Sequence, residues 1–427
     1  MDKKLVLREI FPKVRAHLNE EEITLIIGPR QVGKTTLITQ LKDFLATQNR
    51  ILPENIYYFN LDIVSDRAIF LNQSDFIQFI KNRITATNKL YIFIDEAQRI
   101  TNAGLFFKGV YDLSLPVKMV LTGSSSLDIR AKIMEPLTGR KKLFRLLPFS
   151  FVEYISFKEK ELLPFLAKAD KFAEEKLLAF LYEFVVFGGY PKVLLEDDRG
   201  KKIDHMEEIY TSYLEKDVVG FLRVKDPFVF SKLVRILAEE AGNLFNIERT
   251  SRELQIKNQT IKNYLSVLEN TFIIRRILPF FHSTRTEIRK MPKVYFMDTG
   301  LRNFTKDLRD FPLKSFWDRS DKGSLLENFI LEEMWKTGFP EINFWRTKDG
   351  AEVDFIVNKK SEIIPIEVKS GKVNKQGVPR SLISFINKYH PRVGIIVSLQ
   401  RQKETKVGET EIHYLLPYEL PSFMEKL

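Results

Sequence analysis

Apolar runs and helical repeats alternate along the first half of the chain. Residues 23–27, 90–94 and 117–121 are short, nearly continuous apolar runs, a pattern typical of strands buried in a parallel sheet. Residues 36–41 open a helical repeat after the first run, and residues 55–62 form another strand-like stretch. Strands that alternate with helices predict an α/β fold around a parallel sheet.

The second half shows a different order of elements. Residues 151–220 carry leucine, phenylalanine and charged residues at helical spacing. An amphipathic helix at 230–241 is followed by two short helical stretches, 246–256 and 259–269, and by a strand at 272–277. Helix, turn, helix and strand in this order predict a winged helix-turn-helix.

The first apolar run leads into a loop of the form G-x-x-x-x-G-K-T, the Walker A phosphate-binding loop. In this motif the backbone N–H groups converge on the β-phosphate, the catalytic Lys34 reaches the β- and γ-phosphates, and the Thr35 hydroxyl ligates Mg²⁺. We therefore expect ATP and Mg²⁺ as the cofactors. The nucleotide-binding residues that the motif predicts are Gly28, Pro29, Arg30, Gln31, Val32, Gly33, Lys34, Thr35 and Thr36.

The second apolar run ends in two adjacent carboxylates, Asp95 and Glu96, which form a Walker B pattern. A buried strand would deliver Asp95 beside the phosphate loop, where it can hold Mg²⁺ through water. Glu96 can then orient or deprotonate the attacking water, which favours hydrolysis over binding alone. As an alternative, the same pair simply begins a helix after the strand, where acidic residues are favoured.

The third apolar run ends in the hydroxyl residues Thr122 and Ser124. Ligands bind at the carboxyl edge of open α/β sheets, so either hydroxyl is a candidate sensor of the γ-phosphate, and we assign Ser124 to the catalytic set. The alternative, that these hydroxyls cap a turn or the next helix, has equal weight at this point.

Net charge is uneven along the chain. The formal total is +11, and residues 1–220 hold 32 Lys and Arg against 30 Asp and Glu, so most of the excess lies in the second half. A basic region suggests a polyanionic partner such as DNA, although a lysine-rich solvated surface has the same composition. The absence of cysteine excludes disulfides and thiolate metal sites. No apolar run approaches the ~20 residues of a membrane span, so we expect a cytoplasmic protein with no membrane partner.

The predicted winged helix offers candidate contacts with DNA. Ile261, Leu265 and Leu268 would face the core, which leaves other side chains of the second short helix able to meet bases or phosphates. The predicted nucleic-acid residues are Asn258, Gln259, Lys262 and Asn263, with Arg275 on the following strand. In the alternative, the winged helix makes protein contacts or packs between domains.

The C-terminal part holds a second group of charged residues. Asp354 lies in one strand-like stretch, and Glu367 and Lys369 lie two apart, and so on one face, of the next. An Asp, a hairpin and then Glu-x-Lys resembles the PD-(D/E)XK nuclease core. The resemblance implies that Glu327, Asp354 and Glu367 hold Mg²⁺ and that Lys369 stabilises or activates the hydrolytic water. Alternatively, the domain only binds, with the acid and lysine as a surface ion pair.

Residues 136–154, together with the G-P-R-Q-V-G-K-T form of the phosphate loop, resemble a prokaryotic group of AAA+ family ATPases. Members of this group end in a nuclease-like domain of unknown function of the DUF4143 type. The resemblance implies that Arg140 is a γ-phosphate sensor or an arginine finger, which neutralises charge on the transferred phosphoryl group. A finger supplied by a neighbouring copy would require a homo-oligomer. An ordinary surface arginine is the rival interpretation.

The prediction is therefore an α/β protein with a P-loop AAA+-like ATPase core, a helical lid, a winged helix-turn-helix and a C-terminal restriction-endonuclease-like domain. The predicted bounds are 1–150, 151–225, 226–285 and 286–427. Its function would be ATP hydrolysis in association with DNA, with a Mg²⁺-dependent nuclease domain. The alternative is a nucleotide-regulated signalling or scaffold ATPase whose C-terminal half binds protein and does not cleave DNA.

Overall fold

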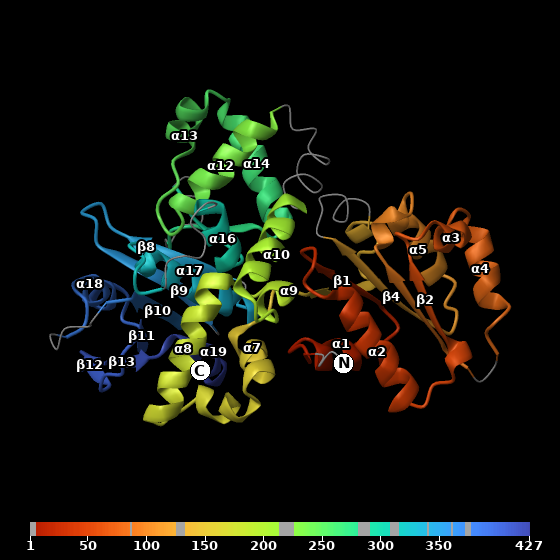
Figure 1. Cartoon of the computed structure of the whole chain (residues 1–427), viewed down its shortest axis with the longest axis horizontal. Helices are drawn as coiled ribbons and strands as arrows, with labels where there is room; N and C mark the ends of the chain where they lie inside the picture. Colours follow the sequence, from red (N-terminus) through yellow and green to blue (C-terminus); the bar gives the residue numbers. More distant parts are fainter. Residues whose placement is uncertain are drawn as a thin grey trace. The chain divides into compact units, whose positions relative to one another are not determined.

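The computed structural model describes residues 6–85, 88–124, 133–212, 226–280, 291–307, 316–339, 341–359, 362–371 and 377–427. The chain divides into two compact units (Figure 1). The first comprises Met1–Pro148 with the short stretch Asn270–Phe272, and the second comprises Phe149–Glu269 and Ile273–Leu427. The predicted domain bounds at 225 and 285 fall outside the described residues.

The first unit is built on a parallel sheet with the strand order β2-β3-β4-β1-β5. The strands are β1 (Ile23–Gly28), β2 (Ile56–Asn60), β3 (Leu90–Asp95), β4 (Val117–Ser124) and β5 (Lys141–Arg145). Both β1 and β3 are buried along their whole length, as continuous apolar runs require. The predicted α/β fold with a parallel sheet is confirmed.

Helices connect the strands of the first unit. Helix α2 buries Leu37, Ile38, Leu41 and Leu45, which recur at the helical spacing that the sequence indicates. The helices are α1 (Phe11–Ala16), α2 (Lys34–Thr47), α3 (Val64–Arg67), α4 (Gln73–Lys81) and α5 (Ala103–Tyr111), with 3₁₀ turns η1 (His17–Asn19), η2 (Pro53–Asn55), η3 (Ala68–Phe70) and η4 (Ala97–Arg99).

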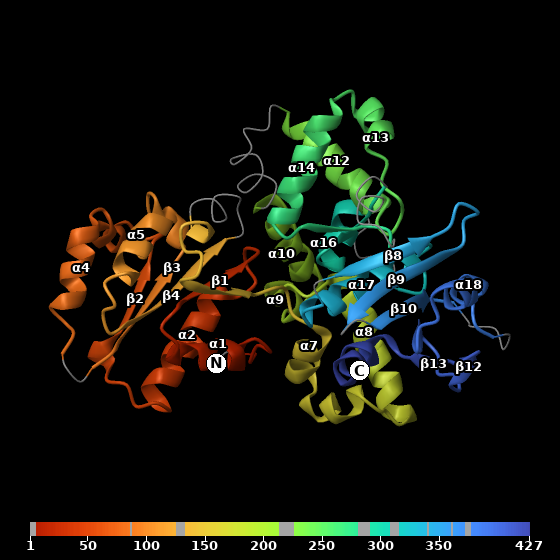
Figure 2. The ribbon, with the colours of Figure 1, turned by 180° about the vertical axis from the view of Figure 1, so that it is seen from behind.

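The second unit contains a mixed sheet in the order β12-β13-β11-β10-β9-β8 (Figure 2). Strands β8, β9 and β10 are antiparallel neighbours, whereas β10, β11 and β13 run parallel. The strands are β8 (Ile342–Arg346), β9 (Glu352–Lys359), β10 (Glu362–Lys369), β11 (Val393–Ser398), β12 (Thr405–Val407) and β13 (Thr410–Leu415). The predicted C-terminal sheet domain is therefore present.

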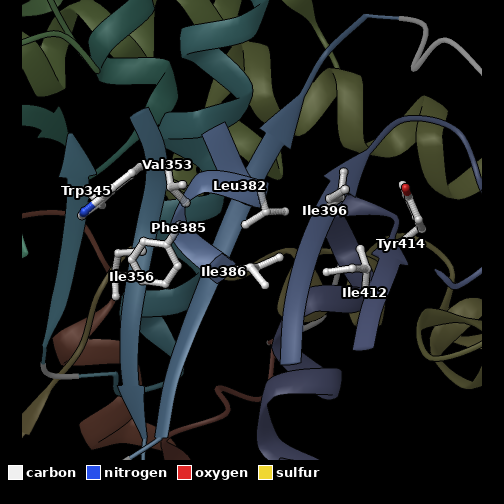
Figure 3. Packing of buried hydrophobic residues seen from close by; sticks show 9 residues of the cluster. All are labelled: Trp345, Val353, Ile356, Leu382, Phe385, Ile386, Ile396, Ile412 and Tyr414. Carbon is white, nitrogen blue, oxygen red and sulfur yellow. The ribbon is translucent and has the colours of Figure 1, made fainter. Parts of the chain in front are cut away.

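Helix α18 (Arg380–Tyr389) covers this sheet with an apolar face. Its Leu382, Phe385 and Ile386 pack against side chains from β8, β9, β11 and β13 (Figure 3). Each fully buried side chain of this kind stabilises the fold by roughly 1.5–3 kcal/mol. The sheet partners are Trp345, Val353, Ile356, Ile396, Ile412 and Tyr414. Helix α17 (Lys322–Lys336) contacts β10, and the chain ends in η8 (Pro417–Glu419) and α19 (Leu420–Lys426).

The helices that follow Pro148 belong to the second unit. Helix α8 contacts both α16 and α17, and α10 contacts α16. Ser150 and Glu153 form a capping box at the start of α7, and Glu333 of α17 accepts a hydrogen bond from the next backbone N–H, at Phe151. The elements are α7 (Phe151–Lys158), η6 (Lys160–Leu166), α8 (Lys171–Phe187), α9 (Pro191–Leu194), α10 (Arg199–Ser212) and α16 (Thr299–Lys306). Within the segment predicted as a lid, the described residues 151–212 are largely helical, and they belong to the same unit as the C-terminal sheet.

A glycine pair joins α8 to α9 where the backbone of this segment approaches Asp298. Gly188 has a φ of 76°, and a Cβ at this position would lie 2.2 Å from an oxygen of Asp298. The N–H of Gly189 donates to the Asp298 carboxylate at 2.7 Å. Asp298 also caps α16 by accepting from the N–H of Leu301 at 2.8 Å. The close approach explains why the sequence needs glycine at 188.

The predicted order of helix, turn, helix and strand is present in the second unit. Ile261, Leu265 and Leu268 are fully buried, which confirms the predicted core face. The elements are α12 (Pro227–Glu239), α13 (Ile247–Leu254), α14 (Asn258–Asn270), β6 (Ile274–Ile277) and β7 (Lys293–Phe296), and β6 and β7 pair antiparallel.

Candidate functional site

The phosphate-binding loop connects the carboxyl end of β1 to the N-terminus of α2. Gly28 ends the strand, and a Cβ there would lie 1.9 Å from the carbonyl oxygen of Leu146, so only glycine fits against the end of β5. Gln31 and Gly33 both adopt positive φ, at 59° and 94°, which turns the loop back toward the helix. Pro29, Arg30 and Val32 complete the loop, and Thr36 lies in the first turn of α2.

Lys34 lies over this loop. Its side chain is only 6% exposed, and its Nζ donates to the carbonyl oxygens of Gly28 at 3.1 Å and Pro29 at 2.9 Å. The ammonium therefore stands where the loop N–H groups and the N-terminus of α2 already favour an anion.

The strand order brings the Walker B acid to the same edge of the sheet. Asp95 ends β3, and its Oδ2 accepts a hydrogen bond from Thr35 Oγ1 at 2.6 Å. The hydroxyl of Thr122, on the intervening strand β4, donates to the other oxygen of Asp95. A hydroxyl and a carboxylate beside a phosphate-binding loop are the donor types that Mg²⁺ prefers with a nucleotide, so these residues fit the ion.

Glu96 follows in a left-handed backbone conformation with a φ of 57°. Its N–H donates to Thr122 Oγ1 at 3.2 Å, and its carboxylate accepts from the side-chain amide of Gln98. Gln98 Nε2 also donates to Ser124 Oγ at 3.2 Å. Glu96 does precede a short helix, η4, yet its side chain forms this polar chain with Gln98 and Ser124. The predicted Ser124 is thus connected to Glu96 through a residue that the sequence motifs did not mark.

Tyr58 is a further member of the site that sequence reasoning missed. Its hydroxyl donates to Asp95 Oδ2 at 3.3 Å from the neighbouring strand β2. Burial, with the charge of Asp95 next to it, raises the pKa of Tyr58 to about 12, so the phenol stays protonated and remains a donor. Strand periodicity gave no signal for this contact, because it depends on which strand lies beside β3.

Arg8 supports the loop from the N-terminal segment. Its side chain is 7% exposed, and its two terminal nitrogens donate to the carbonyl oxygens of Val32 at 2.8 Å and Leu147 at 2.6 Å. The guanidinium thereby ties the phosphate loop to the segment after β5. No motif in the sequence marks this arginine.

Arg140 lies at the amino ends of the parallel strands, whereas the phosphate loop lies at their carboxyl ends. Its carbonyl oxygen accepts from the N–H of Ile23, the first residue of β1, and its side chain pairs with Asp112 at 2.7 Å. The loop begins at Gly28, roughly 16 Å further along the strand at about 3.3 Å per residue. In this structure the Arg140 side chain therefore lies away from the loop of its own chain, and its role as a γ-phosphate sensor stays a prediction. An arginine finger toward a neighbouring copy stays a prediction.

The second group of predicted residues comes together in the second unit. The backbone N–H of Val368, between Glu367 and Lys369, donates to Asp354 at 2.7 Å, and Lys369 Nζ contacts Glu367 at 2.6 Å. Burial, with Glu327 and Glu367 nearby, raises the pKa of Asp354 well above its usual range. Burial also raises the pKa of Glu367, although Lys369 opposes the shift.

An irregular register in β9 lies at Asp354. Asn343 of β8 pairs with Ile356, but Trp345, two residues on, pairs with Val353, so β9 holds one extra residue across this step. Such bulges re-aim side chains and are over-represented next to active sites. The alternation of side chains along a strand assumes a regular strand, so the sequence pattern could not reveal this bulge.

Strand β7 adds two residues that the sequence did not mark. Lys293 Nζ lies 3.1 Å from Glu327 Oε1 and 2.6 Å from Glu352 Oε1, and the hydroxyl of Tyr295 also donates to Glu327. Burial works against the charge of Lys293, but the two glutamates raise its pKa above the usual value.

Among the described residues, no three acidic or histidine side chains stand as a ready set of metal ligands. Within the same part of the chain, however, Glu367 Oε2 is buried and has no hydrogen-bond partner. An unmatched buried carboxylate oxygen beside Asp354 fits a cation, so the donor types suit Mg²⁺ although the ligand set is not assembled. The predicted metal site at Glu327, Asp354 and Glu367 stays a prediction.

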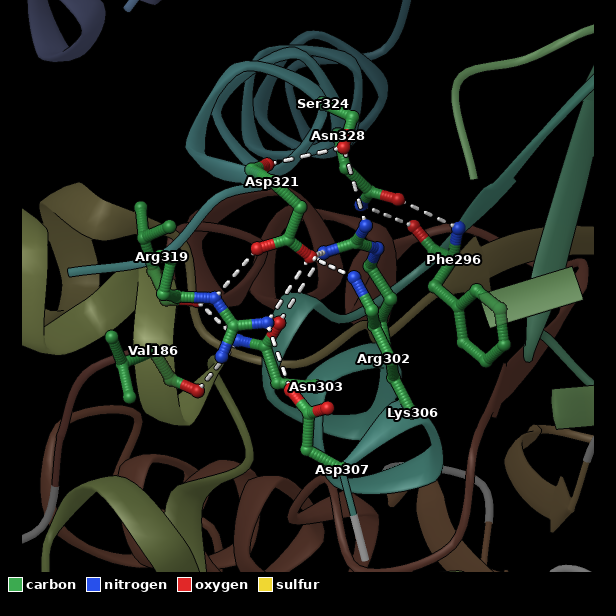
Figure 4. Close-up of polar contacts among 11 residues, drawn as sticks. Val186, Phe296, Arg302, Asn303, Lys306, Asp307, Arg319, Asp321, Ser324 and Asn328 are labelled. Carbon is green, nitrogen blue, oxygen red and sulfur yellow. Dashed lines mark hydrogen bonds and ion pairs between the residues drawn. The ribbon is translucent and has the colours of Figure 1, made fainter. Parts of the chain in front are cut away.

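A polar network fixes the helix that carries Glu327. Asp321, at the N-terminus of α17, pairs with Arg302 at 3.0 Å and Lys306 at 2.7 Å, and also with Arg319 (Figure 4). The side-chain amide of Asn328 bonds both the N–H and the carbonyl oxygen of Phe296, at 2.9 and 2.8 Å. The Asn328 bonds hold α17 against β7, and the Asp321 pairs tie the start of α17 to α16. The backbone that carries Glu327 is therefore held beside the strand that carries Lys293.

The predicted nucleic-acid residues fall into two groups. Asn258, Gln259, Lys262 and Asn263 are exposed on one side of α14. Arg275 differs, because it is half-buried on β6 and its guanidinium lies 4.5 Å from the ring centre of Trp335. A role of these five residues in binding DNA stays a prediction.

Family models match three segments of the chain. Residues 20–155 match an AAA domain, residues 179–311 a domain of unknown function (DUF8612), and residues 322–420 a domain of unknown function (DUF4143). The chain therefore carries a nucleotide-binding domain of the AAA-type ATPases. It combines this domain with a C-terminal DUF4143 domain, which confirms the combination that the sequence indicated. In the part of the chain that the structure covers, no helix has the length and apolar character of a membrane span.

Two relatives extend over most of the chain. An uncharacterized protein of Haemophilus influenzae is 24% identical and covers 98% of this chain and 99% of its own length. An uncharacterized protein of Methanocaldococcus jannaschii is 26% identical and covers 87% of this chain and 80% of its own. The shared length indicates that the whole arrangement, and not the AAA domain alone, recurs in prokaryotes.

Solved structures give weaker likenesses. The Aeropyrum pernix ORC2 protein in ADPNP–ADP complexes has a TM-score of 0.38 at 12% identity, and the match covers 64% of this chain and 90% of that chain. A DNA polymerase III gamma subunit-related protein of Thermotoga maritima has a TM-score of 0.25 at 15% identity, covering 62% of this chain and 97% of that chain. At scores below 0.5, neither likeness bears on the function of this chain.

Proposed function

We propose that the chain is an ATP-hydrolysing, DNA-associated AAA+-type protein whose C-terminal domain carries a Mg²⁺-dependent nuclease site. The observation that supports hydrolysis most strongly is the meeting of Thr35, Asp95 and Thr122 in one hydrogen-bonded group beside the phosphate loop. A strand end that merely closed a turn would not need a buried carboxylate, 3% exposed, between two hydroxyls.

In this proposal Lys34 exchanges its two loop carbonyls for the β- and γ-phosphate oxygens of ATP. Thr35 and Asp95 would hold the Mg²⁺, and the ion would neutralise phosphate charge when bound. Glu96 orients the attacking water or accepts its proton, and its carboxylate is kept in place by Gln98 and, beyond it, Ser124.

The DNA association is supported by charge and exposure. Most of the net charge of +11 lies in the second half of the chain, where α14 exposes Asn258, Gln259, Lys262 and Asn263. Lysine binds phosphate oxygens, and asparagine and glutamine bind base edges. Arg275 is the fifth predicted contact, and its guanidinium lies over the ring of Trp335.

Nuclease activity is supported by the buried group of acids. Glu327, Asp354 and Glu367 would hold Mg²⁺, and Lys369, 2.6 Å from Glu367, would stabilise or activate the hydrolytic water. The second candidate function is a nucleotide-regulated scaffold whose C-terminal half binds protein. It is favoured by one specific observation, the engagement of Glu327 by Lys293 and Tyr295.

The test compares wild type with Lys34→Ala, Lys369→Ala and Lys262→Ala. ATP hydrolysis is measured with and without duplex DNA, DNA binding is measured at several salt concentrations, and cleavage of single- and double-stranded DNA is measured with Mg²⁺. We expect Lys34→Ala to abolish hydrolysis, Lys262→Ala to weaken salt-sensitive DNA binding, and Lys369→Ala to abolish cleavage.

A wild-type chain that hydrolyses ATP but neither binds nor cleaves DNA would overturn the DNA role and favour the scaffold. The control is Lys201→Ala, because Lys201 is an exposed lysine on α10, away from α14 in the sequence. It should leave all three measurements unchanged.

A further inference from the structure

Lys293 is an internal cation among the acids of the C-terminal site. Its side chain is 2% exposed and lies between Glu327 and Glu352, at 3.1 and 2.6 Å. Tyr295, two residues further along β7 and so on the same face, donates to the same glutamate oxygen that Lys293 contacts. Glu327 is therefore already neutralised and hydrogen-bonded from β7.

The charges of this group explain why such a cation is needed. Buried carboxylates require a cationic or hydrogen-bonding partner. Lys369 forms an ion pair with Glu367, and Lys293 forms ion pairs with Glu327 and Glu352. If a divalent ion bound to Glu327, the Lys293 ammonium would lie close to it, because Lys293 Nζ is 3.1 Å from Glu327 Oε1. Two positive charges so close together repel strongly in a buried site.

We propose that Lys293 is a built-in counter-cation that competes with a divalent metal ion for Glu327, so that the C-terminal site takes up the ion only when the ammonium withdraws. This inference rests on the proposed metal site and concerns its regulation. It also agrees with the finding that, among the described residues, no three acidic or histidine side chains form a group that could hold a metal ion.

The test is Mn²⁺ binding to the full chain without nucleotide, measured from the loss of the free Mn²⁺ signal in electron paramagnetic resonance. The variants are Lys293→Met and Lys293→Met with Asp354→Asn. We expect Lys293→Met to bind one additional Mn²⁺ at least about tenfold more tightly than wild type. Addition of Asp354→Asn should remove this gain. Binding by Lys293→Met no tighter than by wild type would overturn the proposal.

A second pair of variants guards against loss of folding. Lys293→Met leaves Glu327 without its counter-charge, which is destabilising, while Glu352 keeps Arg346 at 2.7 Å. Lys293→Met with Glu352→Gln, in contrast, keeps the net charge of the site and all three predicted ligands. This charge-neutral variant should also gain Mn²⁺ affinity. Lys293→Arg keeps the cation and should show no gain. A folded charge-neutral variant with wild-type affinity would refute the competition.

DNA cleavage separates this inference from the proposed nuclease function. If Lys293→Met binds Mn²⁺ tightly but neither it nor wild type cleaves DNA, the competition stands and the nuclease proposal fails. If wild type cleaves DNA with Mg²⁺ and Lys293→Met gains no Mn²⁺ affinity, the nuclease proposal stands and the competition fails.

Discussion

The hydroxyl of Thr122 contacts both Walker B residues, the carboxylate of Asp95 and the backbone of Glu96. The substitution Thr122→Val tests this role. The hydroxyl donates to Asp95 and accepts the backbone N–H of Glu96 at 3.2 Å, and the side chain is fully buried. Valine has nearly the same shape but no hydroxyl. The substitution therefore leaves one oxygen of Asp95 and one backbone N–H without this partner, while the packing stays close to native.

The magnitude follows from the kind of hydrogen bond that is lost. A bond to a charged group contributes about 1.5–3 kcal/mol. If that energy acts in the transition state, the loss corresponds to a fall in kcat of about 10- to 150-fold. The assay is steady-state ATP hydrolysis with saturating Mg²⁺, together with the affinity for a fluorescent ATP analogue. We expect a lower kcat and a nearly unchanged affinity, because Lys34 and the loop are not altered.

Thr24→Val is the matched control. Thr24 is also fully buried and hydrogen-bonded, to His17 at 2.8 Å, but it lies near the start of β1, at the opposite edge of the sheet from the loop. It should lose stability without losing kcat. The reasoning is refuted if Thr122→Val hydrolyses ATP at the wild-type rate, or if both variants lose kcat to the same extent.

Three further predictions concern residues around the two units. Arg8→Met should weaken ATP binding by about tenfold, measured with a fluorescent analogue, since the loop loses its charged support; unchanged affinity would contradict this. Arg140→Ala should leave hydrolysis by the monomeric chain within about twofold of wild type, because Arg140 pairs with Asp112 away from the loop; a larger loss in the monomer would count against the geometry. Burial, with neighbouring acids, raises the pKa of Glu332 to about 8, although Lys336 opposes the shift. The protonated carboxyl therefore stabilises the folded state fully below pH ~4.3, and this contribution to the free energy of unfolding is lost as pH rises through 8. Glu332→Gln should flatten the resulting decline in the free energy of unfolding in urea between about pH 5 and 8; an identical slope in both proteins would be inconsistent with the shift.

The sequence predicted the features that depend on local spacing. The phosphate loop and the acids after β3 are contiguous motifs, so their residue types and the buried strands before them could be recognised without knowing the sheet order. The buried face of α14 followed from the spacing of Ile261, Leu265 and Leu268 in the same way.

Contacts between distant elements could not be predicted in this way. Tyr58 reaches Asp95 because β2 lies next to β3, and Lys293 reaches Glu327 because β7 packs against α17. Neither neighbour relation is encoded in the spacing of one segment. The same reason explains Arg140, whose edge of the sheet depends on the parallel pairing of β5 with β1.

The helical segment after Pro148 shows a similar limit. The helices predicted from the spacing of its apolar residues are present, but this spacing does not indicate which sheet a helix packs against. The contacts of α8 with α16 and α17, and the hydrogen bond from Gly189 to Asp298, make it part of the second unit. Packing partners of this kind are set by tertiary structure.

The most direct test of the central claim is ATP hydrolysis by Glu96→Gln. Glutamine keeps the size of the side chain and removes the carboxylate that orients or deprotonates water. We predict that the variant binds ATP as wild type does and hydrolyses it at least about 100-fold more slowly. Hydrolysis at the wild-type rate would contradict the assignment of Glu96 and, with it, the proposed hydrolytic mechanism.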